Sequence, residues 1–221
     1  MRVTIITEDS GVKLPAIDRY HGTIGKGVKL SQHTQLNQVL QENKLNIPSD
    51  DIEQESVYRT VLKDFIRPAK LMFAGMFSEV RLFYEELKKR YNDVELLIIS
   101  GRYGIVNGEE EIIPYDFHLE SYELIRELDD RTNFFDELIK KIRSSDYIII
   151  TLGKEFVSYL LDKGFLDIVG SHPQLIFVTS SMFKDKIVEA GHIFLQKTGV
   201  ARIREENKRR IMAILEGESV G

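Results

Sequence analysis

The largely apolar run at residues 94–99 ends abruptly in the small-residue turn 100–104, Ser-Gly-Arg-Tyr-Gly. A run this short and apolar is typical of a strand that is buried on both faces of a sheet. Gly101 and Gly104 permit positive φ angles and close approach of another group, so the chain can turn sharply there. The sequence therefore predicts a buried strand that delivers Arg102 and Tyr103 to one edge of a sheet. The alternative is a tight connection in which Tyr103 packs on that sheet.

Three other short runs, 2–7, 146–152 and 175–179, are also apolar or β-branched, and residues with helical periodicity lie between them. Helices that alternate with apolar strands favour right-handed crossovers. We therefore expect an α/β fold with a mainly parallel sheet and helices on both faces. Since 221 residues suit one domain, we expect a single domain over 1–221.

Each of these strands is followed by a polar or small turn. The turns are Thr7-Glu8-Asp9, residues 100–104, Gly153-Lys154 and Ser180-Ser181. Open parallel sheets bind ligands beyond the carboxyl ends of their strands, which predicts a site along this rim. The strand order is not fixed by the sequence, so which turns are neighbours stays open.

A polar stretch rich in Gln and Asn, residues 31–56, interrupts this alternation. We expect this stretch to contain one short helix and to close over the site as a lid, within an excursion from the sheet over about 31–67. The chain has no cysteine, which excludes disulfides and zinc–cysteine sites. Its apolar runs are shorter than a membrane span, and its first residues lack a targeting pattern, so we expect a cytoplasmic protein without membrane association.

Motifs for metals and common cofactors are missing from the chain. The five histidines are scattered, with no His-Glu-x-x-His spacing, and no Gly-x-Ser-x-Gly elbow occurs. No Gly-x-Gly-x-x-Gly follows a strand, which argues against a dinucleotide cofactor. The sequence predicts neither a bound metal nor a cofactor.

Two further stretches accompany the turn at 100–104. One is Ile113-Pro114-Tyr115-Asp116, and the other is Lys13-Leu14-Pro15-Ala16-Ile17-Asp18-Arg19-Tyr20-His21-Gly22. Together with the strand that runs into Gly153-Lys154, these motifs resemble the YaaA-like proteins and a related microbial and phage domain family. The resemblance implies an α/β protein that acts on, or binds, a nucleotide or nucleic acid. Members often carry a cysteine after the first strand, where this chain has Asp9 or Ser10.

If the protein is an enzyme, the resemblance favours cleavage of an N-glycosidic bond or related base chemistry. Asp9 or Asp116 would stabilise oxocarbenium character or activate water. Tyr103 or Tyr115 would stack on a base, and phosphate would bind to cationic side chains. The expected substrate-binding residues are Lys13, Tyr20, Ser100, Gly101, Arg102, Tyr103, Gly104, Tyr115, Gly153 and Lys154, with Arg102 and Lys154 as the phosphate ligands.

A basic segment near the end of the chain supports a second class of function. Between Lys197 and Arg210, six cations stand against two glutamates, and we expect a helix over about 200–215. Such a helix could bind a phosphate backbone, away from the acidic stretch 108–130. The expected nucleic-acid contacts are Arg202, Arg204, Lys208 and Arg209. For this segment the alternative is a solvated helix with internal ion pairs. A third class of function is a small-ligand sensor closed by residues 31–56. No oligomeric state is predicted.

Overall fold

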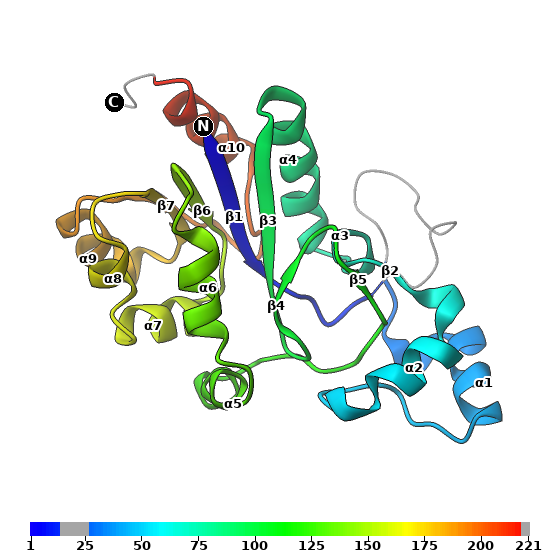
Figure 1. Cartoon of the computed structure of the whole chain (residues 1–221). Coiled ribbons are helices and arrows are strands. Elements are labelled where there is room, and N and C mark those ends of the chain that lie inside the picture. Colours follow the sequence, from blue (N-terminus) through cyan, green and yellow to red (C-terminus); the bar gives the residue numbers. More distant parts are fainter. Residues whose placement is uncertain (14–26, 218–221) are drawn as a thin grey trace.

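The structure is a computed structural model, which describes residues 1–13 and 27–217 (Figure 1). Tyr20 and the rest of the stretch 14–22 lie outside the described residues. Six strands form one sheet in the order β4-β3-β1-β6-β7-β8, and every neighbouring pair is parallel except β3 with β4. The predicted α/β fold with a mainly parallel sheet is confirmed. The strands are β1 (Arg2–Glu8), β3 (Asp93–Ser100), β4 (Gly104–Asn107), β6 (Tyr147–Ile150), β7 (Gln174–Thr179) and β8 (Ile193–Gln196).

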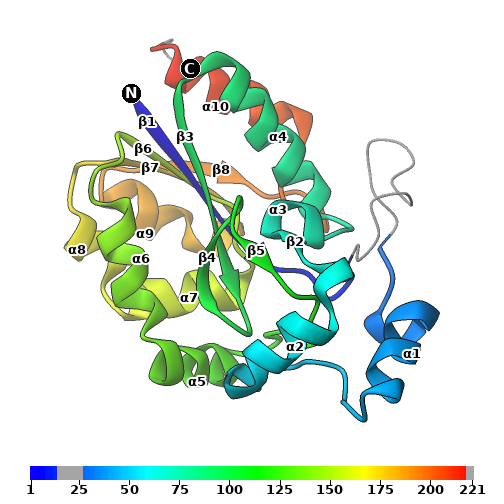
Figure 2. The ribbon, with the colours of Figure 1, turned by 45° about the vertical axis from the view of Figure 1, so that its right-hand side comes forward.

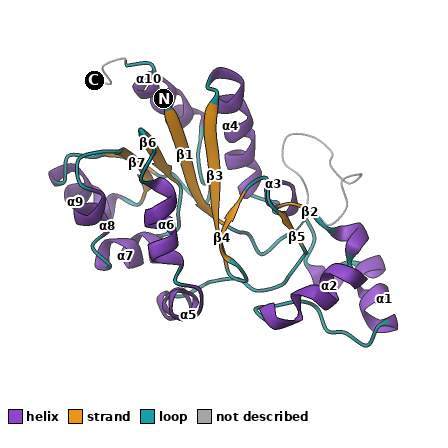
Figure 3. Ribbon diagram, in the orientation of Figure 1, coloured by secondary structure: helices purple, strands orange, loops and turns teal. Residues whose placement is uncertain are grey.

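Helices cover both faces of the sheet, because side chains alternate along each strand and both sets are apolar. On β1, Val3 and Ile5 belong to one core cluster and Ile6 belongs to the other. The first face packs against α3 (Ala69–Met72), α4 (Phe77–Arg90) and α10 (Glu205–Leu215), of which α4 and α10 lie side by side in Figure 2. The second face carries α5 (Tyr122–Thr132), α6 (Phe134–Ile142), α7 (Lys154–Asp162), α8 (Phe165–Val169) and α9 (Lys184–Glu189) (Figure 3). Within the described residues, no helix has the length and apolarity needed to cross a membrane.

Residues 30–66 form a separate helical layer, called the cap from here on, beside the carboxyl end of β3 (Figure 1). Residues 31–56 contain one complete α-helix, a second begins at Glu55, and the cap has its own small core around Leu36, Tyr58 and Leu62. Ile113, from a distant part of the chain, completes this core. The short strands β2 (Arg67–Pro68) and β5 (Glu111–Ile112) pair where the cap joins the sheet. The cap elements are η2 (Leu30–Gln32), α1 (Thr34–Glu42), η3 (Ile52–Gln54), α2 (Glu55–Val61) and η4 (Lys63–Phe65).

Two local features differ from the expected ones. The turn at 100–104 is the tip of a hairpin, in which Ser100 of β3 pairs with Gly104 of antiparallel β4. Gly104 has φ +79°, and a Cβ there would lie 2.9 Å from the Thr132 hydroxyl, so both its conformation and its surroundings require glycine. The last helix begins at Glu205 rather than near residue 200, because the backbone of Arg204 is still extended.

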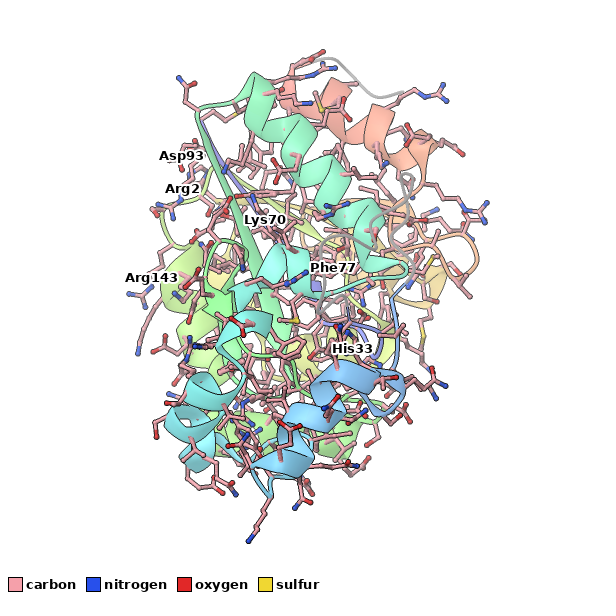
Figure 4. All side chains as sticks on the ribbon, turned by 90° about the vertical axis from the view of Figure 1, so that its right-hand side faces the viewer. Arg2, His33, Lys70, Phe77, Asp93 and Arg143 are labelled. Carbon is pink, nitrogen blue, oxygen red and sulfur yellow. The ribbon has the colours of Figure 1, made fainter. Side chains whose placement is uncertain are left out.

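Ion pairs occupy the amino edge of the sheet. Figure 4 shows Arg2 and Asp93 at the start of their strands, and Arg2 Nη2 lies 2.8 Å from a carboxylate oxygen of Glu95. The backbone N–H of Arg2 donates to the Asp146 carboxylate at 2.6 Å. The polar side chains at the amino edge are thus engaged in these pairs, and the polar turns that follow β1, β3 and β6 lie at the opposite, carboxyl edge.

Candidate functional site

The strand order places the end of β1 between the ends of β3 and β6. Asp9 directly follows β1, and its N–H donates to the carbonyl of Ile99 in β3 at 3.0 Å. On the other side, the Glu8 carboxylate accepts the Gly153 N–H at 2.9 Å. The turns after β1, β3 and β6 are therefore direct neighbours, whereas Ser180 follows β7, one strand further away.

Asp9 is the centre of a compact hydrogen-bonded group at this edge. Asp9 is only 2% exposed, and its Oδ2 accepts a hydrogen bond from the Gly101 N–H at 3.0 Å. The Tyr115 hydroxyl also donates to Oδ2 and lies 2.7 Å from the Ser100 hydroxyl. The other carboxylate oxygen, Oδ1, lies 3.4 Å from Nδ1 of His118. One oxygen is thus fixed by buried donors and the other faces an imidazole.

The charges in this group reinforce one another. Burial alone would raise the pKa of the Asp9 carboxyl, but the hydrogen bond from His118 and the charge of Lys13 outweigh it, so this pKa lies below its ordinary value. The same hydrogen bond raises the pKa of His118, against a smaller opposing effect of its partial burial. Asp9 is therefore ionised near neutral pH, and the His118 imidazole titrates above its usual range.

Lys13 is a buried basic residue of the site. It is fully buried, its Nζ donates to the Ser10 carbonyl, and this nitrogen lies 4.7 Å from the centre of the Tyr115 ring. Burial lowers the pKa of Lys13, and the carboxylates of Asp9 and Asp116 offset part of that effect. Lys13 thus balances the Asp9 charge from inside, and is too enclosed to bind a substrate in this conformation.

His118 is the residue that the sequence predictions missed. Its side chain is 37% exposed, so a group outside the protein can reach the imidazole, unlike the buried Asp9 carboxylate. The available signal was its position two residues after the Pro114-Tyr115-Asp116 motif. Asp116 itself is exposed, with its backbone N–H donating to the Pro48 carbonyl at 2.7 Å. Lys154 is also exposed, at the first residue of α7.

The expected role of Arg102 in phosphate binding does not fit its surroundings. The side chain is fully buried, and it forms ion pairs with Asp51 at 2.6 Å and Glu55 at 2.9 Å in the cap. Burial disfavours the charge, but the hydrogen bonds to these two carboxylates outweigh it and raise the pKa of Arg102. Arg102 therefore joins the cap to the turn rather than facing a ligand.

The tyrosines are also more enclosed than a base-stacking role requires. Tyr115 is fully buried, and its ring contacts Phe73 and Tyr103 edge to face. Tyr103 is partly buried, and its hydroxyl donates to Glu55 at 2.8 Å.

Gly101 takes part in the site through its backbone, since its N–H donates to Asp9. A Cβ at this position would lie 2.8 Å from the ring of Phe117, so a larger residue would disturb the turn.

The four residues predicted to contact nucleic acid differ in their exposure: two are buried or paired, and two are open to solvent. Arg202 is buried, and it donates to the Thr7 hydroxyl at 2.9 Å and to the carbonyls of Glu8 and Asp9. Lys208 is bound to Glu205 at 2.6 Å, with its side chain 14% exposed. Arg204 and Arg209 are exposed. Four candidate phosphate ligands are thereby reduced to two open ones, which weakens the prediction of a binding helix.

Within residues 1–13 and 27–217, no three His, Asp or Glu side chains are placed to hold a metal ion together. Comparisons with known protein families, with curated proteins and with solved structures find no match to this chain. The chemistry available at this site therefore follows from the geometry of Asp9, Tyr115 and His118.

Proposed function

We propose that Asp9 and His118 form the acid–base centre of an enzyme that cleaves an N-glycosidic bond in a nucleoside or nucleotide. The observation that carries this proposal is the contact between a buried, ionised carboxylate and a partly exposed imidazole at the end of the central strand. The substrate class is supported by the resemblance of the motifs around residues 13–22, 100–106 and 113–116 to the YaaA-like proteins.

The geometry suits proton transfer by His118. The Nδ1–H group of His118 donates a hydrogen bond to the Asp9 carboxylate, which orients the ring and stabilises the imidazolium, so Nε2 is the nitrogen that serves a substrate. In the proposed reaction, the imidazolium donates its proton to the leaving base while the bond from C1′ to nitrogen breaks and its electron pair goes to the base. Water forms the new bond to C1′, and the neutral imidazole accepts the proton of that water.

Asp116 is the second carboxylate available for this reaction. It is exposed and lies two residues from His118, and its charge acts on Lys13 of the same group. A carboxylate in such a position stabilises the positive charge that develops on the sugar. Asp9 and Asp116 then have different tasks, because one is buried against His118 and the other is open to solvent.

The test measures by chromatography the release of free base from nucleosides, nucleoside 5′-phosphates and short single-stranded oligonucleotides. Replacing His118→Ala or Asp9→Asn is expected to slow release by about 10²- to 10⁴-fold, the usual contribution of a positioned acid or base. His172→Ala is the matched control, since this exposed histidine precedes β7 at the opposite edge of the sheet. Its rate should equal that of the wild type.

Two results would overturn the proposal. One is that the wild-type protein releases no base from any member of this substrate panel. The other is that His118→Ala retains the wild-type rate while the protein remains folded by circular dichroism. Loss of activity in His172→Ala would show instead that the assay reports general damage to the fold.

A further inference from the structure

Every N–H group of the Arg102 guanidinium is used by the cap. Nε and Nη2 donate to the Glu55 carboxylate at 3.1 and 2.9 Å, and Nη1 donates to the Asp51 carboxylate at 2.6 Å. The remaining donors bind the carbonyls of Ser49 at 2.6 Å and Asp51 at 3.1 Å. The guanidinium therefore makes five hydrogen bonds to four acceptor atoms, all between residues 49 and 55, with one Glu55 oxygen accepting two of them.

The backbone around the same residue holds the Asp9 carboxylate. The N–H groups of Arg102 and Tyr103 both donate to the Ser100 hydroxyl, at 3.3 and 3.1 Å. That hydroxyl lies 2.7 Å from the Tyr115 hydroxyl, which donates to Asp9. The preceding residue, Gly101, gives its N–H directly to Asp9. A displacement of this turn would therefore move both groups that fix Oδ2 of Asp9.

Helix α5 holds the turn from another side. Arg131 donates to the carbonyls of Gly101 at 2.7 Å and Arg102 at 3.1 Å, and it also contacts the Asp50 carbonyl in the cap at 3.4 Å. The turn is thus tied to α5 through its carbonyls, and to the cap through the side chains of Arg102 and Tyr103. Arg102 is completely buried, so losing its charge would remove the ion pairs to Asp51 and to Oε2 of Glu55, while Oε1 of Glu55 would keep its contacts with Arg59 and Tyr103.

We infer that Arg102 is a positioning residue for the Asp9–His118 pair, and that docking of the cap through Asp51 and Glu55 orders the turn that orients Asp9. This inference rests on the proposed function, because it assigns the cap the regulation of that same site. With Arg102 unpaired, the turn no longer fixes Oδ2 of Asp9, and the contact of Oδ1 with His118 loosens. The site is then competent only when the cap is docked.

The imidazole of His118 reports this coupling without any substrate. The charged groups that act on it are Asp9, Lys13 and Glu8, and the contact with Asp9 has the largest effect on its pKa. None of these three residues is altered by a change at Arg102. A fall in the pKa of His118 toward its ordinary value of 6.5 would therefore measure the loss of the Asp9 contact.

The experiment is an NMR pH titration of His118 in the wild type and in Arg102→Gln, Arg102→Lys and Asp9→Asn. Arg102→Gln is expected to lower the pKa of His118, as Asp9→Asn does. Arg102→Lys should lower it less than Arg102→Gln, because lysine keeps the positive charge. Base release by Arg102→Gln should fall by about 10- to 100-fold, as expected for a misplaced catalytic group. Glu55→Gln, which keeps the arginine, tests the same coupling if Arg102→Gln does not fold.

Tyr159→Phe is the matched control, since this buried tyrosine donates to Asp129 at 2.6 Å among the helices of the second face. It should leave the pKa of His118 unchanged even where it destabilises the protein. If Asp9→Asn lowers that pKa while folded Arg102 and Glu55 variants do not, the coupling is overturned and the proposed function survives. If Asp9→Asn leaves the pKa unchanged, the Asp9–His118 contact is wrong and both proposals fail.

Discussion

Tyr115 determines, at the scale of single residues, which oxygen of Asp9 is available to His118. Burial and the nearby Asp9 charge raise the pKa of Tyr115 well above its ordinary value, so its hydroxyl stays protonated and remains a donor. Oδ2 of Asp9 accepts hydrogen bonds from this hydroxyl and from the Gly101 N–H, which leaves Oδ1 for the imidazole. Tyr115, which is fully buried, thus determines how Asp9 orients the partly exposed His118.

The contact between Asp9 and His118 also makes stability depend on pH. Because folding raises the pKa of His118 above 6.5, its contribution to the unfolding free energy is full below that value and disappears as the pH rises through the raised pKa. In urea unfolding experiments, the stability of the wild type relative to His118→Gln should therefore decline as the pH rises from 6.5 through the raised pKa of His118. Asp9, whose pKa is lowered, stays charged over this interval. A difference that is constant with pH would contradict the Asp9–His118 contact.

The sequence predicted the position of this group better than the tasks of its members. Asp9, Ser100 and Gly101 follow from the rule that polar turns gather beyond the carboxyl ends of parallel strands. Arg102 was assigned to a phosphate because its partners, Asp51 and Glu55, lie about 50 residues away in a segment whose fold the sequence did not reveal. His118 was missed because one histidine in an acidic loop has no distinguishing pattern.

At the scale of helices and strands, predictability follows the length of the periodic pattern. Helices α4 and α6 each bury five apolar side chains, and both lie between the predicted strands, where the sequence has helical periodicity. In the cap, α1 buries only Leu36 and Leu40, and α2 buries only Tyr58. Two or three apolar positions do not define a helix in the sequence, and the cap core needs Ile113 from a distant segment.

Because this core is small and separate, the cap should open independently of the sheet. Leu36→Ala removes a fully buried side chain from α1 and should weaken the cap by about 2–5 kcal/mol. Hydrogen exchange measured by mass spectrometry should become faster over residues 34–62, while β1 and β3 remain protected. Leu82→Ala, at a 37% exposed position on α4, is the control and should leave exchange in the cap unaltered. Equal acceleration in cap and sheet would show that they unfold as one unit.

At the scale of the whole molecule, the segment before α10 returns to the central strand. Arg202 binds Thr7 and the carbonyls of Glu8 and Asp9, and the Glu79 carboxylate on α4 accepts the backbone N–H of Arg202 at 3.1 Å. Burial lowers the pKa of Arg202, with the charges of Glu8 and Asp9 opposing that effect. Two parts of the chain nearly 200 residues apart are thereby joined behind the site, a contact that counting charges along the sequence does not reveal.

The buried position of Arg202 and the exposed position of Arg209 give opposite predictions for two otherwise similar substitutions. Arg202→Met keeps the volume but leaves buried acceptors without a donor, so the unfolding free energy should fall by about 3 kcal/mol or more. Arg209→Met, on the surface of α10, should change it by about 0.5 kcal/mol or less. Urea unfolding of both variants makes the comparison, and the affinity for a short oligonucleotide at several salt concentrations is measured alongside. If Arg202 instead contacted phosphate, its removal would reduce the log-log salt slope by about 0.7 to 0.9 with no loss of stability, and that pair of results would contradict a structural role.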